Sequence, residues 1–388
     1  MKNVKVRKKD GTLERYDPEK IKAAIGKSAA RINYKFSDET LEDILACVAE
    51  QAEQEGAEII DVGLMHSFVE GALEEYAPKV CKSYREYRNY KTEFVYMLDE
   101  VYKRSQSIMY IGDKENSNMD STLVSTKRSL IFNELNKELY KKFFLTREEL
   151  QAVNDGFIYI HDMSARRDTM NCCLFDVASV LSGGFEMGNI WYNEPKTLDT
   201  AFDVIGDIVL SAAAQQYGGF TMPEVDKILE PYAEKSYKKS YEKYMEMFQS
   251  VGSSGKDAER LAEAEAMKDV QREFEQGYQG WEYKFNTVGS SRGDYPFIAI
   301  TFGLGTGKFE KMCSKTILNV HKDGQGKAGA KRPVLFPKLI FLYDKEIHGE
   351  GGINRDVYDA AIKCSSVAMY PDWLSLTGEG YVSEIYKK

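Results

Sequence analysis

Residues 156–184 read GFIYIHDMSARRDTMNCCLFDVASVLSGG, and this stretch determines the fold that the sequence predicts. Its short apolar runs at 158–160 and 174–175 are typical of buried strands. Polar residues follow the first run as His-Asp at 161–162 and precede the second as Cys-Cys at 172–173. Because catalytic barrels carry their reactive groups at the ends of strands, we expect two strands here with a reactive site beside them.

The two adjacent cysteines have opposite expected environments. A free cysteine usually packs as a small buried hydrophobic residue. Successive side chains of a strand point to opposite faces, so at most one of Cys172 and Cys173 can face a pocket. His161, taken alone, is equally compatible with an ordinary core or surface position. The residues of this stretch therefore leave a structural role and a catalytic role open.

Several blocks along the chain together resemble the anaerobic, class III ribonucleotide reductases. Asn171-Cys172 after His161-Asp162 is similar to the first barrel strand of that family, and the Asn-rich loop at 115–118 matches its substrate loop. Further blocks follow in family order: PKT at 195–197, QYGG at 216–219 and RPVLFPK at 332–338. The resemblance covers nearly the whole chain. It implies an α/β fold in which an amino-terminal α+β ATP-cone precedes part of a ten-stranded α/β barrel of the glycyl-radical type.

Length and composition are those of a soluble globular protein of two or three domains. The chain has 388 residues, 43% of them hydrophobic and 29% charged. Its net charge of −9 argues against a nucleic-acid partner. With no apolar run of membrane-spanning length and no signal peptide, we expect a cytoplasmic protein without a membrane partner. The six cysteines and four histidines are scattered, so no disulfide framework and no metal site is expected.

Residues 1–95 are expected to form a small α+β module. Val4 and Val6 begin a strand, a turn follows at 9–11, and a second strand returns through Leu13. Asp17 precedes Pro18, a typical start of a helix, and two further amphipathic helices follow. We place the domain boundary at 95, with residues 96–388 forming the incomplete barrel.

The charged residues of this module resemble the ATP-cone, a regulatory domain that binds adenine nucleotides. The pattern is Lys8-Lys9-Asp10-Gly11, Glu14, Tyr16-Asp17 and Lys20. The resemblance implies that the phosphates are held by Lys8, Lys9 and Lys20, with Lys91 reaching them from the last helix. It places Glu14 and Asp17 at the nucleoside. The family commonly has Arg where this chain has Lys9, which supplies a point charge instead of a bidentate fork.

Other parts of the sequence predict helices and strands more plainly. Thr146 opens a capping box, and the helix after it stops at 154–156. Residues 91–106 are expected to form a linking helix, residues 225–276 a mostly polar helical region interrupted at 252–255, and residues 295–301 a buried strand.

The reaction that the resemblance implies is reduction of ribonucleoside triphosphates to deoxyribonucleoside triphosphates. The resemblance implies that Cys172 delivers reducing hydrogen and that Cys173 is structural. It also implies that Asn118, His161 and Asn171 position the substrate. ATP and dATP act as allosteric effectors, formate is the expected reductant with a thioredoxin-like protein as the alternative, and the partners are a radical-SAM activase and further copies of the chain.

The resemblance also implies that some of the family's machinery lies beyond Lys388. The thiyl-radical cysteine, a four-cysteine zinc site and the radical glycine have no counterpart before that residue. We therefore expect these residues alone to have no turnover. Two alternatives are a nucleotide-binding regulatory fragment without catalysis and a different glycyl-radical enzyme. The ATP-cone pattern argues against the latter.

Overall fold

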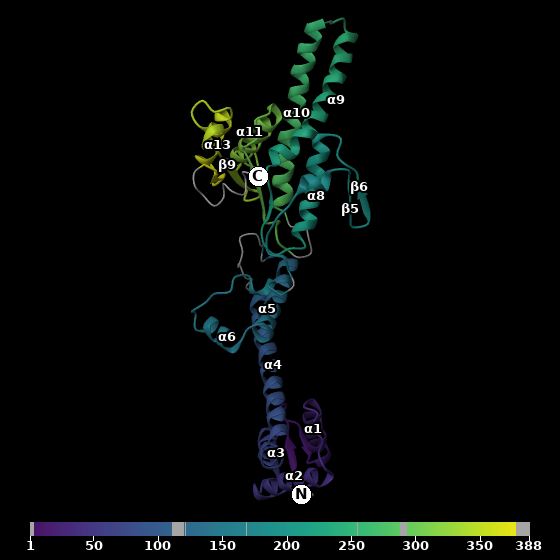
Figure 1. The fold of residues 1–388 in the computed structure, drawn as a ribbon, viewed down its shortest axis with the longest axis vertical. Helices are drawn as coiled ribbons and strands as arrows, with labels where there is room; N and C mark the ends of the chain where they lie inside the picture. Colours follow the sequence, from purple (N-terminus) through teal and green to yellow (C-terminus); the bar gives the residue numbers. More distant parts are fainter. Residues whose placement is uncertain are drawn as a thin grey trace. The chain divides into compact units, whose positions relative to one another are not determined.

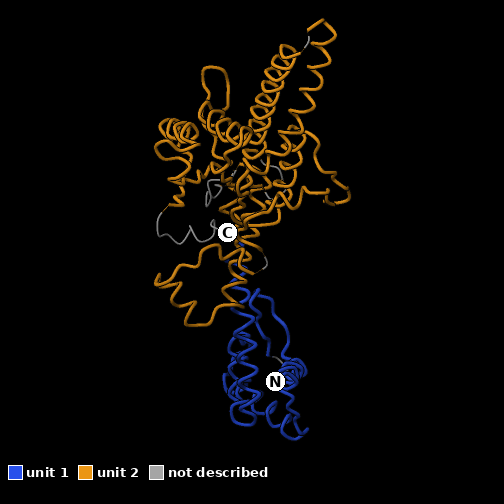
Figure 2. The backbone as a smooth tube through the Cα atoms, turned by 45° about the horizontal axis from the view of Figure 1, so that its top comes forward, with its two compact units in different colours: residues 1–103 blue, residues 104–388 orange. Residues whose placement is uncertain are grey.

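A computed structural model describes residues 4–110, 120, 122–167, 169–253, 255–287 and 293–377. The chain divides into two compact units, residues 1–103 and residues 104–388, which Figure 2 shows in different colours. Within the described ranges, no helix is long and apolar enough to cross a membrane.

The amino-terminal unit is a three-stranded sheet covered by helices. β1 pairs antiparallel with β2 and parallel with β3, giving the order β2-β1-β3. Its core combines Ile25, Ile44, Ile60 and Leu73. The expected hairpin and three helices are confirmed, and Asp17 caps the first helix through the Glu19 amide. The elements are β1 (Lys5–Arg7), β2 (Leu13–Arg15), α1 (Pro18–Arg31), α2 (Asp38–Gln54), β3 (Ile59–Asp61), α3 (Val62–Tyr76) and α4 (Pro78–Tyr110).

Helix α4 is longer than the sequence led us to expect. The predicted linking helix at 91–106 is not a separate element but the second half of one 33-residue helix. The reason lies in the composition of α4, because no Gly or Pro follows Pro78 within it to end the helix.

The larger unit combines a parallel sheet with long helices. The capping box of Thr146 is confirmed, and so is the helical region of 225–276, which the structure divides into α9 and α10. These two helices lie side by side as a long hairpin (Figure 1). The elements are α5 (Val124–Phe143), α6 (Arg147–Asn154), η1 (Met163–Ala165), β4 (Cys173–Leu174), α7 (Val177–Leu181), β5 (Phe185–Met187), β6 (Ile190–Tyr192), α8 (Leu198–Ala213), β7 (Phe220–Met222), α9 (Val225–Ser250), α10 (Gly255–Phe285), β8 (Ile298–Phe302), α11 (Lys308–Asp323), β9 (Lys338–Tyr343), α12 (Lys345–His348), α13 (Arg355–Ser365) and β10 (Asp372–Ser375).

The central sheet of this unit has five parallel strands in the order β10-β9-β8-β7-β4. The expected α/β class is therefore confirmed. Closure into a ten-stranded barrel stays a prediction, because five strands are joined in this sheet among the described residues.

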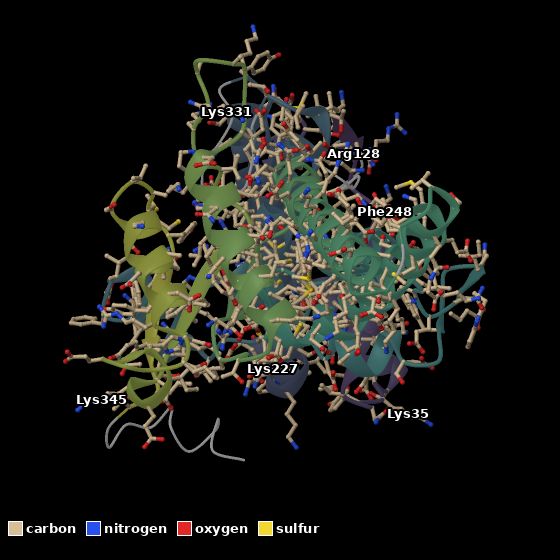
Figure 3. All side chains as sticks on the ribbon, turned by 90° about the horizontal axis from the view of Figure 1, so that it is seen from above. Lys35, Arg128, Lys227, Phe248, Lys331 and Lys345 are labelled. Carbon is tan, nitrogen blue, oxygen red and sulfur yellow. The ribbon has the colours of Figure 1, made fainter. Side chains whose placement is uncertain are left out.

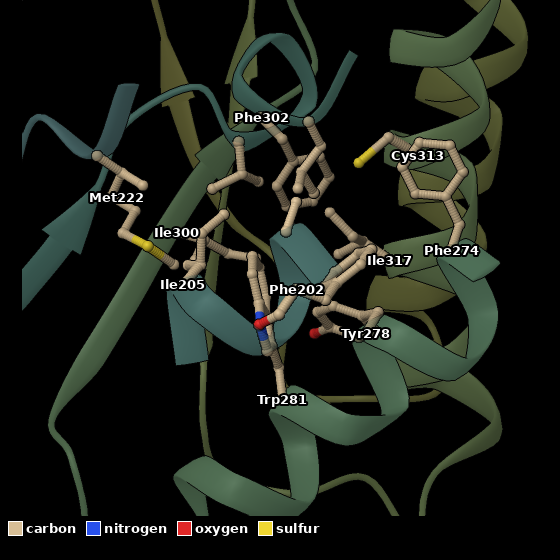
Figure 4. Close-up of a cluster of buried hydrophobic side chains, with 14 of the residues drawn as sticks. Phe202, Ile205, Met222, Phe274, Tyr278, Trp281, Ile300, Phe302, Cys313 and Ile317 are labelled. Carbon is tan, nitrogen blue, oxygen red and sulfur yellow. The ribbon is translucent and has the colours of Figure 1, made fainter. Parts of the chain in front are cut away.

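One face of the sheet is buried under helices. Phe220, Ile298 and Phe341 point to this face and are completely buried. Helix α10 contributes Trp281, whose indole N–H donates to the Phe202 carbonyl at 2.8 Å. Figure 4 shows how the rings of this cluster converge between the strands and helices. This core fixes the strands whose other face carries the cysteine site.

The predicted strand at 158–160 is wrong. Ile158 is 44% exposed and Tyr159 is 86% exposed, and neither belongs to a strand. The chain turns at both ends of this segment, since Gly156 and Asp162 have positive φ values of 79° and 53°. The apolar run thus lacks a neighbouring strand, and the sheet begins at Cys173 instead.

Candidate functional site

A cationic pocket lies in the amino-terminal unit. Its volume is about 580 Å³, and it is formed by the β1–β2 turn, the start of α3 and the middle of α4. The basic side chains that line it are Lys8, Lys9, Arg88 and Lys91. Four cationic side chains around one cavity are suited to bind a polyanion such as a phosphate chain.

The structure brings together three of the six residues predicted to bind nucleotide here. Lys8, Lys9 and Lys91 line the pocket. The Glu14 carboxylate pairs with Lys8 and Lys20, and hydrogen bonds from Lys20 and then Lys8 lower its pKa. Glu14 therefore links the hairpin to α1 beside the pocket.

Asp17, the sixth predicted residue, has an evident structural role. Its carboxylate accepts the Glu19 backbone N–H at 3.0 Å at the start of α1. A capping carboxylate of this kind stabilises the helix whether or not a nucleotide is present.

Arg88 and His66 also line the pocket, and neither was predicted from the sequence. Arg88 lines the cavity one turn before Lys91 and pairs with Glu70 at 2.6 Å. His66 contributes from α3, and its Nδ1 lies 2.7 Å from the Tyr84 hydroxyl. Burial and then the charge of Arg88 lower the pKa of His66, so the ring is neutral at pH 7. The spacing of Arg88 and Lys91 on one helix face was the available signal.

The cysteine site lies at the start of β4, the last strand in the order of the central sheet among the described residues. Cys172 is exposed, whereas the Cys173 side chain packs against the buried core and its thiol donates to Gln216 Oε1 at 3.1 Å. Burial raises the pKa of Cys173. Because Cys172 is exposed and Cys173 packs against the core, Cys172 is the more accessible of the two thiols.

A β-bulge lies opposite Cys172, on the strand that pairs with β4. Met170 pairs with Gln216, and Cys173 pairs with Phe220. Between these two pairs the chain advances by three residues on the side of β4 and by four residues on the side of β7, so the β7 side carries one extra residue. The extra residue lies at 217–219. A Cβ on Gly218 would come within 2.3 Å of the Asn171 carbonyl oxygen and 2.9 Å of the Cys172 sulfur. Only glycine fits there without displacing these atoms.

The other predicted substrate residues have different environments. Asn171 is half-buried beside Cys172, and its Oδ1 has no hydrogen-bond partner among the described residues. The His161 side chain is 77% exposed and pairs with Asp162 at 2.7 Å. Asn118 and the loop at 115–118 lie outside the described residues.

Two protein-family models match the chain. Residues 115–387 match the family model described as anaerobic ribonucleoside-triphosphate reductase, and residues 4–93 match the ATP cone domain. The chain therefore combines an ATP cone domain with an α/β module of the kind found in anaerobic reductases. It belongs to the anaerobic ribonucleoside-triphosphate reductase family.

Two curated relatives at 30% identity or more bear the same family name. The anaerobic ribonucleoside-triphosphate reductase of Haemophilus influenzae is 32% identical over 97% of this chain and 52% of its own length. That of Enterobacteria phage T4 is 35% identical over 67% of this chain and 42% of its own length. A solved anaerobic ribonucleotide reductase from Thermotoga maritima, in complex with dATP and CTP, matches at 13% identity over 74% of this chain and 49% of that chain, with a TM-score of 0.46. The chain spans about half the length of the curated relatives that it matches.

Proposed function

We propose that the protein containing this chain reduces ribonucleoside triphosphates to deoxyribonucleoside triphosphates and that ATP and dATP regulate it. The observation that carries the proposal is the match of residues 115–387 to the reductase family model, with the exposed Cys172 thiol at the position implied by the resemblance. The regulatory domain is residues 1–95, and residues 96–388 form part of the catalytic barrel.

Effector binding is assigned to the pocket of the amino-terminal unit. The charges of Lys8, Lys9 and Lys91 support phosphate binding there, and the pocket is large enough for a nucleotide. Lys20, Glu14 and Asp17 complete the proposed site. A role for Lys20 and Glu14 requires that their ion pair opens when the nucleotide enters.

The chemical role proposed for this chain is hydrogen delivery by Cys172. In the reduction, the 2′ hydroxyl takes up a proton and leaves as water, the Cys172 thiol gives a hydrogen atom to the 2′ carbon, and formate is oxidised to carbon dioxide to supply the two electrons of the net reaction. Asn171 and His161, together with Asn118, are proposed to position the substrate. The orphaned Oδ1 of Asn171 is able to accept a hydrogen bond from a ribose hydroxyl.

The remaining family components are proposed partners of this chain. They are formate as reductant, a radical-SAM activase, further copies of the chain, and the glycyl radical with its zinc site. Among the described residues no cluster of His, Cys, Asp or Glu is able to hold a metal ion, so these residues do not fit the zinc site. We propose the cytoplasm as the place of action.

Calorimetric titration with ATP and dATP tests the regulatory half of the proposal. Both nucleotides are expected to bind, and a Lys8→Ala, Lys9→Ala double variant is expected to bind at least about tenfold more weakly, because two charged phosphate contacts are lost. Lys5→Ala, Arg15→Ala is a matched control, since these exposed cations lie on the same hairpin but do not line the pocket.

Two results of this titration would contradict the proposal. Unchanged affinity in the pocket variant would show that nucleotide binds elsewhere. If the folded wild-type chain bound neither nucleotide, the assignment of a working ATP-cone would be wrong.

A further inference from the structure

The sheet face opposite the helices carries a continuous row of partly exposed side chains. Pairing of β4 with β7, β7 with β8 and β8 with β9 aligns Leu174, Thr221, Ala299 and Lys338 across four strands. Side chains alternate along each strand, so Cys172 and Phe297, two residues earlier, belong to the same face. We call this set of residues the open face.

Close contacts join Cys172 to the far end of this row. A Cβ on Gly219 would lie 4.0 Å from the Cys172 sulfur and 3.4 Å from the Phe297 ring, so both side chains flank this glycine. The Lys338 ammonium lies 4.5 Å from the centre of the Phe297 ring. Thiol, aromatic ring and ammonium thus follow one another across the sheet, from the β4 side towards β9.

Lys338 is unusual in this position. The residues aligned with it are the aliphatic Leu174 and Ala299 and the uncharged Thr221. Lys338 is half-buried, and within the part of the chain that the structure describes no carboxylate lies at ion-pair distance from its ammonium. A cation–π contact holds the ammonium in place but does not neutralise its charge. An anionic group on the open face would therefore be stabilised by Lys338.

The separation between the Cys172 thiol and the Lys338 ammonium indicates which kind of anion binds at Lys338. The strand that carries Phe297 is two strand spacings, or about 10 Å, from the strand that carries Cys172, and Lys338 is on the strand beyond it. A small carboxylate held at Lys338 would be out of reach of the Cys172 thiol. A ribonucleoside triphosphate is long enough to place its ribose at the thiol and its phosphate chain at the ammonium.

We propose that Lys338 binds the phosphate chain of the nucleotide substrate, on the same sheet face as the Cys172 thiol. This inference rests on the proposed function, because it takes Cys172 as the residue beside the ribose. Lys338 is then a further substrate-binding residue, which attracts the phosphates through its positive charge. The nucleotide lies across the strands, with its ribose near β4 and its phosphate chain towards β9.

Protection of Cys172 from alkylation tests this proposal without requiring turnover. The full chain is treated with iodoacetamide, and modification of Cys172 is followed by mass spectrometry in the presence of CTP or cytidine. CTP is chosen because the ATP-cone resemblance concerns adenine nucleotides. We expect CTP to protect the wild-type thiol at a concentration at least about tenfold lower than cytidine, since only CTP carries the phosphates.

Three variants separate the charge from the packing. Lys338→Met keeps an unbranched side chain over Phe297 but removes the ammonium, so CTP should lose its advantage over cytidine. Lys338→Arg keeps the charge and should retain most of the protection, which also guards against misfolding as an explanation. Lys345→Met removes an exposed lysine at the periphery (Figure 3) and should leave protection unchanged.

The outcomes distinguish this inference from the function on which it rests. Protection by CTP that is equal in wild type and Lys338→Met would overturn the role of Lys338 and leave the substrate site at Cys172 standing. An equal loss of protection in Lys345→Met would show that protection depends only on the overall positive charge of the chain. It would also overturn the role of Lys338. If CTP fails to protect the wild-type thiol, both the inference and the proposed substrate site are wrong.

Discussion

Replacing Asp226 by Ala is expected to lower the free energy of unfolding of the larger unit by about 4 kcal/mol. Asp226 lies in the first turn of α9 and is completely buried. Its Oδ2 accepts the backbone N–H groups of Gly303 at 2.9 Å and Gly305 at 3.1 Å, and the Ser314 hydroxyl at 3.2 Å. Removal of the carboxylate leaves three buried donors without a partner, which is the reason for the large cost.

The segment that Asp226 holds is fixed from its other side as well. The Gly303 carbonyl accepts from His348 Nε2 at 2.9 Å and from Asn354 Nδ2 at 3.1 Å. Burial lowers the pKa of His348, so its ring is neutral and donates through Nε2 alone. Since the turn after β8 depends on both sets of contacts, loss of Asp226 should loosen this end of the sheet.

Tryptophan fluorescence during urea unfolding measures this effect directly. All three tryptophans, Trp191, Trp281 and Trp373, belong to the larger unit. Asp257→Ala is the matched control, because Asp257 is also in the first turn of a helix but is exposed. It should change stability by less than about 1 kcal/mol. A similar small change in Asp226→Ala would contradict the proposed importance of the buried contacts.

Asp226→Asn adds a pH test. Burial raises the pKa of Asp226, and the donors around it oppose that rise only in part. A carboxyl whose pKa is higher in the folded state stabilises the fold most below its unfolded pKa of about 4, and this contribution is lost as the pH rises through the folded pKa. Wild type should therefore lose stability relative to Asp226→Asn between about pH 4 and neutral pH. A constant difference over this range would mean that the pKa is not raised.

Features that depend on neighbours in sequence were predictable. The capping residues Asp17 and Thr146 need only the next few residues, and both helices begin where the sequence indicated. The strand expected at 158–160 depended instead on a partner strand elsewhere in the chain, which periodicity does not reveal. Residues 173–174 have such a partner in β7, and the sheet begins there.

The candidate sites also combine residues that a local sequence pattern predicts with residues that only distant parts of the chain bring together. Lys8 and Lys9 were found from a local pattern, whereas His66 joins them only because α3 and α4 meet at the hairpin. Lys338 was part of a matched block, but its place above Phe297 follows from strand pairing across 41 residues of sequence. Contacts of this kind are set by register, and register is determined by the whole sheet.

Replacing Gly218 by Ala is expected to destabilise the larger unit by about 3 kcal/mol and to change the alkylation rate of Cys172. The added methyl would overlap the Asn171 carbonyl oxygen, which is backbone and cannot move without disturbing the pairing of β4 with β7. It would also press on the Cys172 sulfur. Urea unfolding followed by tryptophan fluorescence gives the stability, and mass spectrometry after iodoacetamide treatment gives the reactivity of the thiol.

Gly219→Ala is the control that isolates the bulge, because the two glycines are adjacent and differ in what a methyl group would meet. At Gly219 the nearest atom is a Phe297 ring carbon at 3.4 Å, an ordinary contact, so the change should be within about 1 kcal/mol and Cys172 should react nearly as before. Equal effects at both positions would mean that glycine serves backbone freedom in this turn. A large effect confined to Gly218 would show that glycine is required there because a methyl group would overlap the Asn171 carbonyl oxygen and press on the Cys172 sulfur.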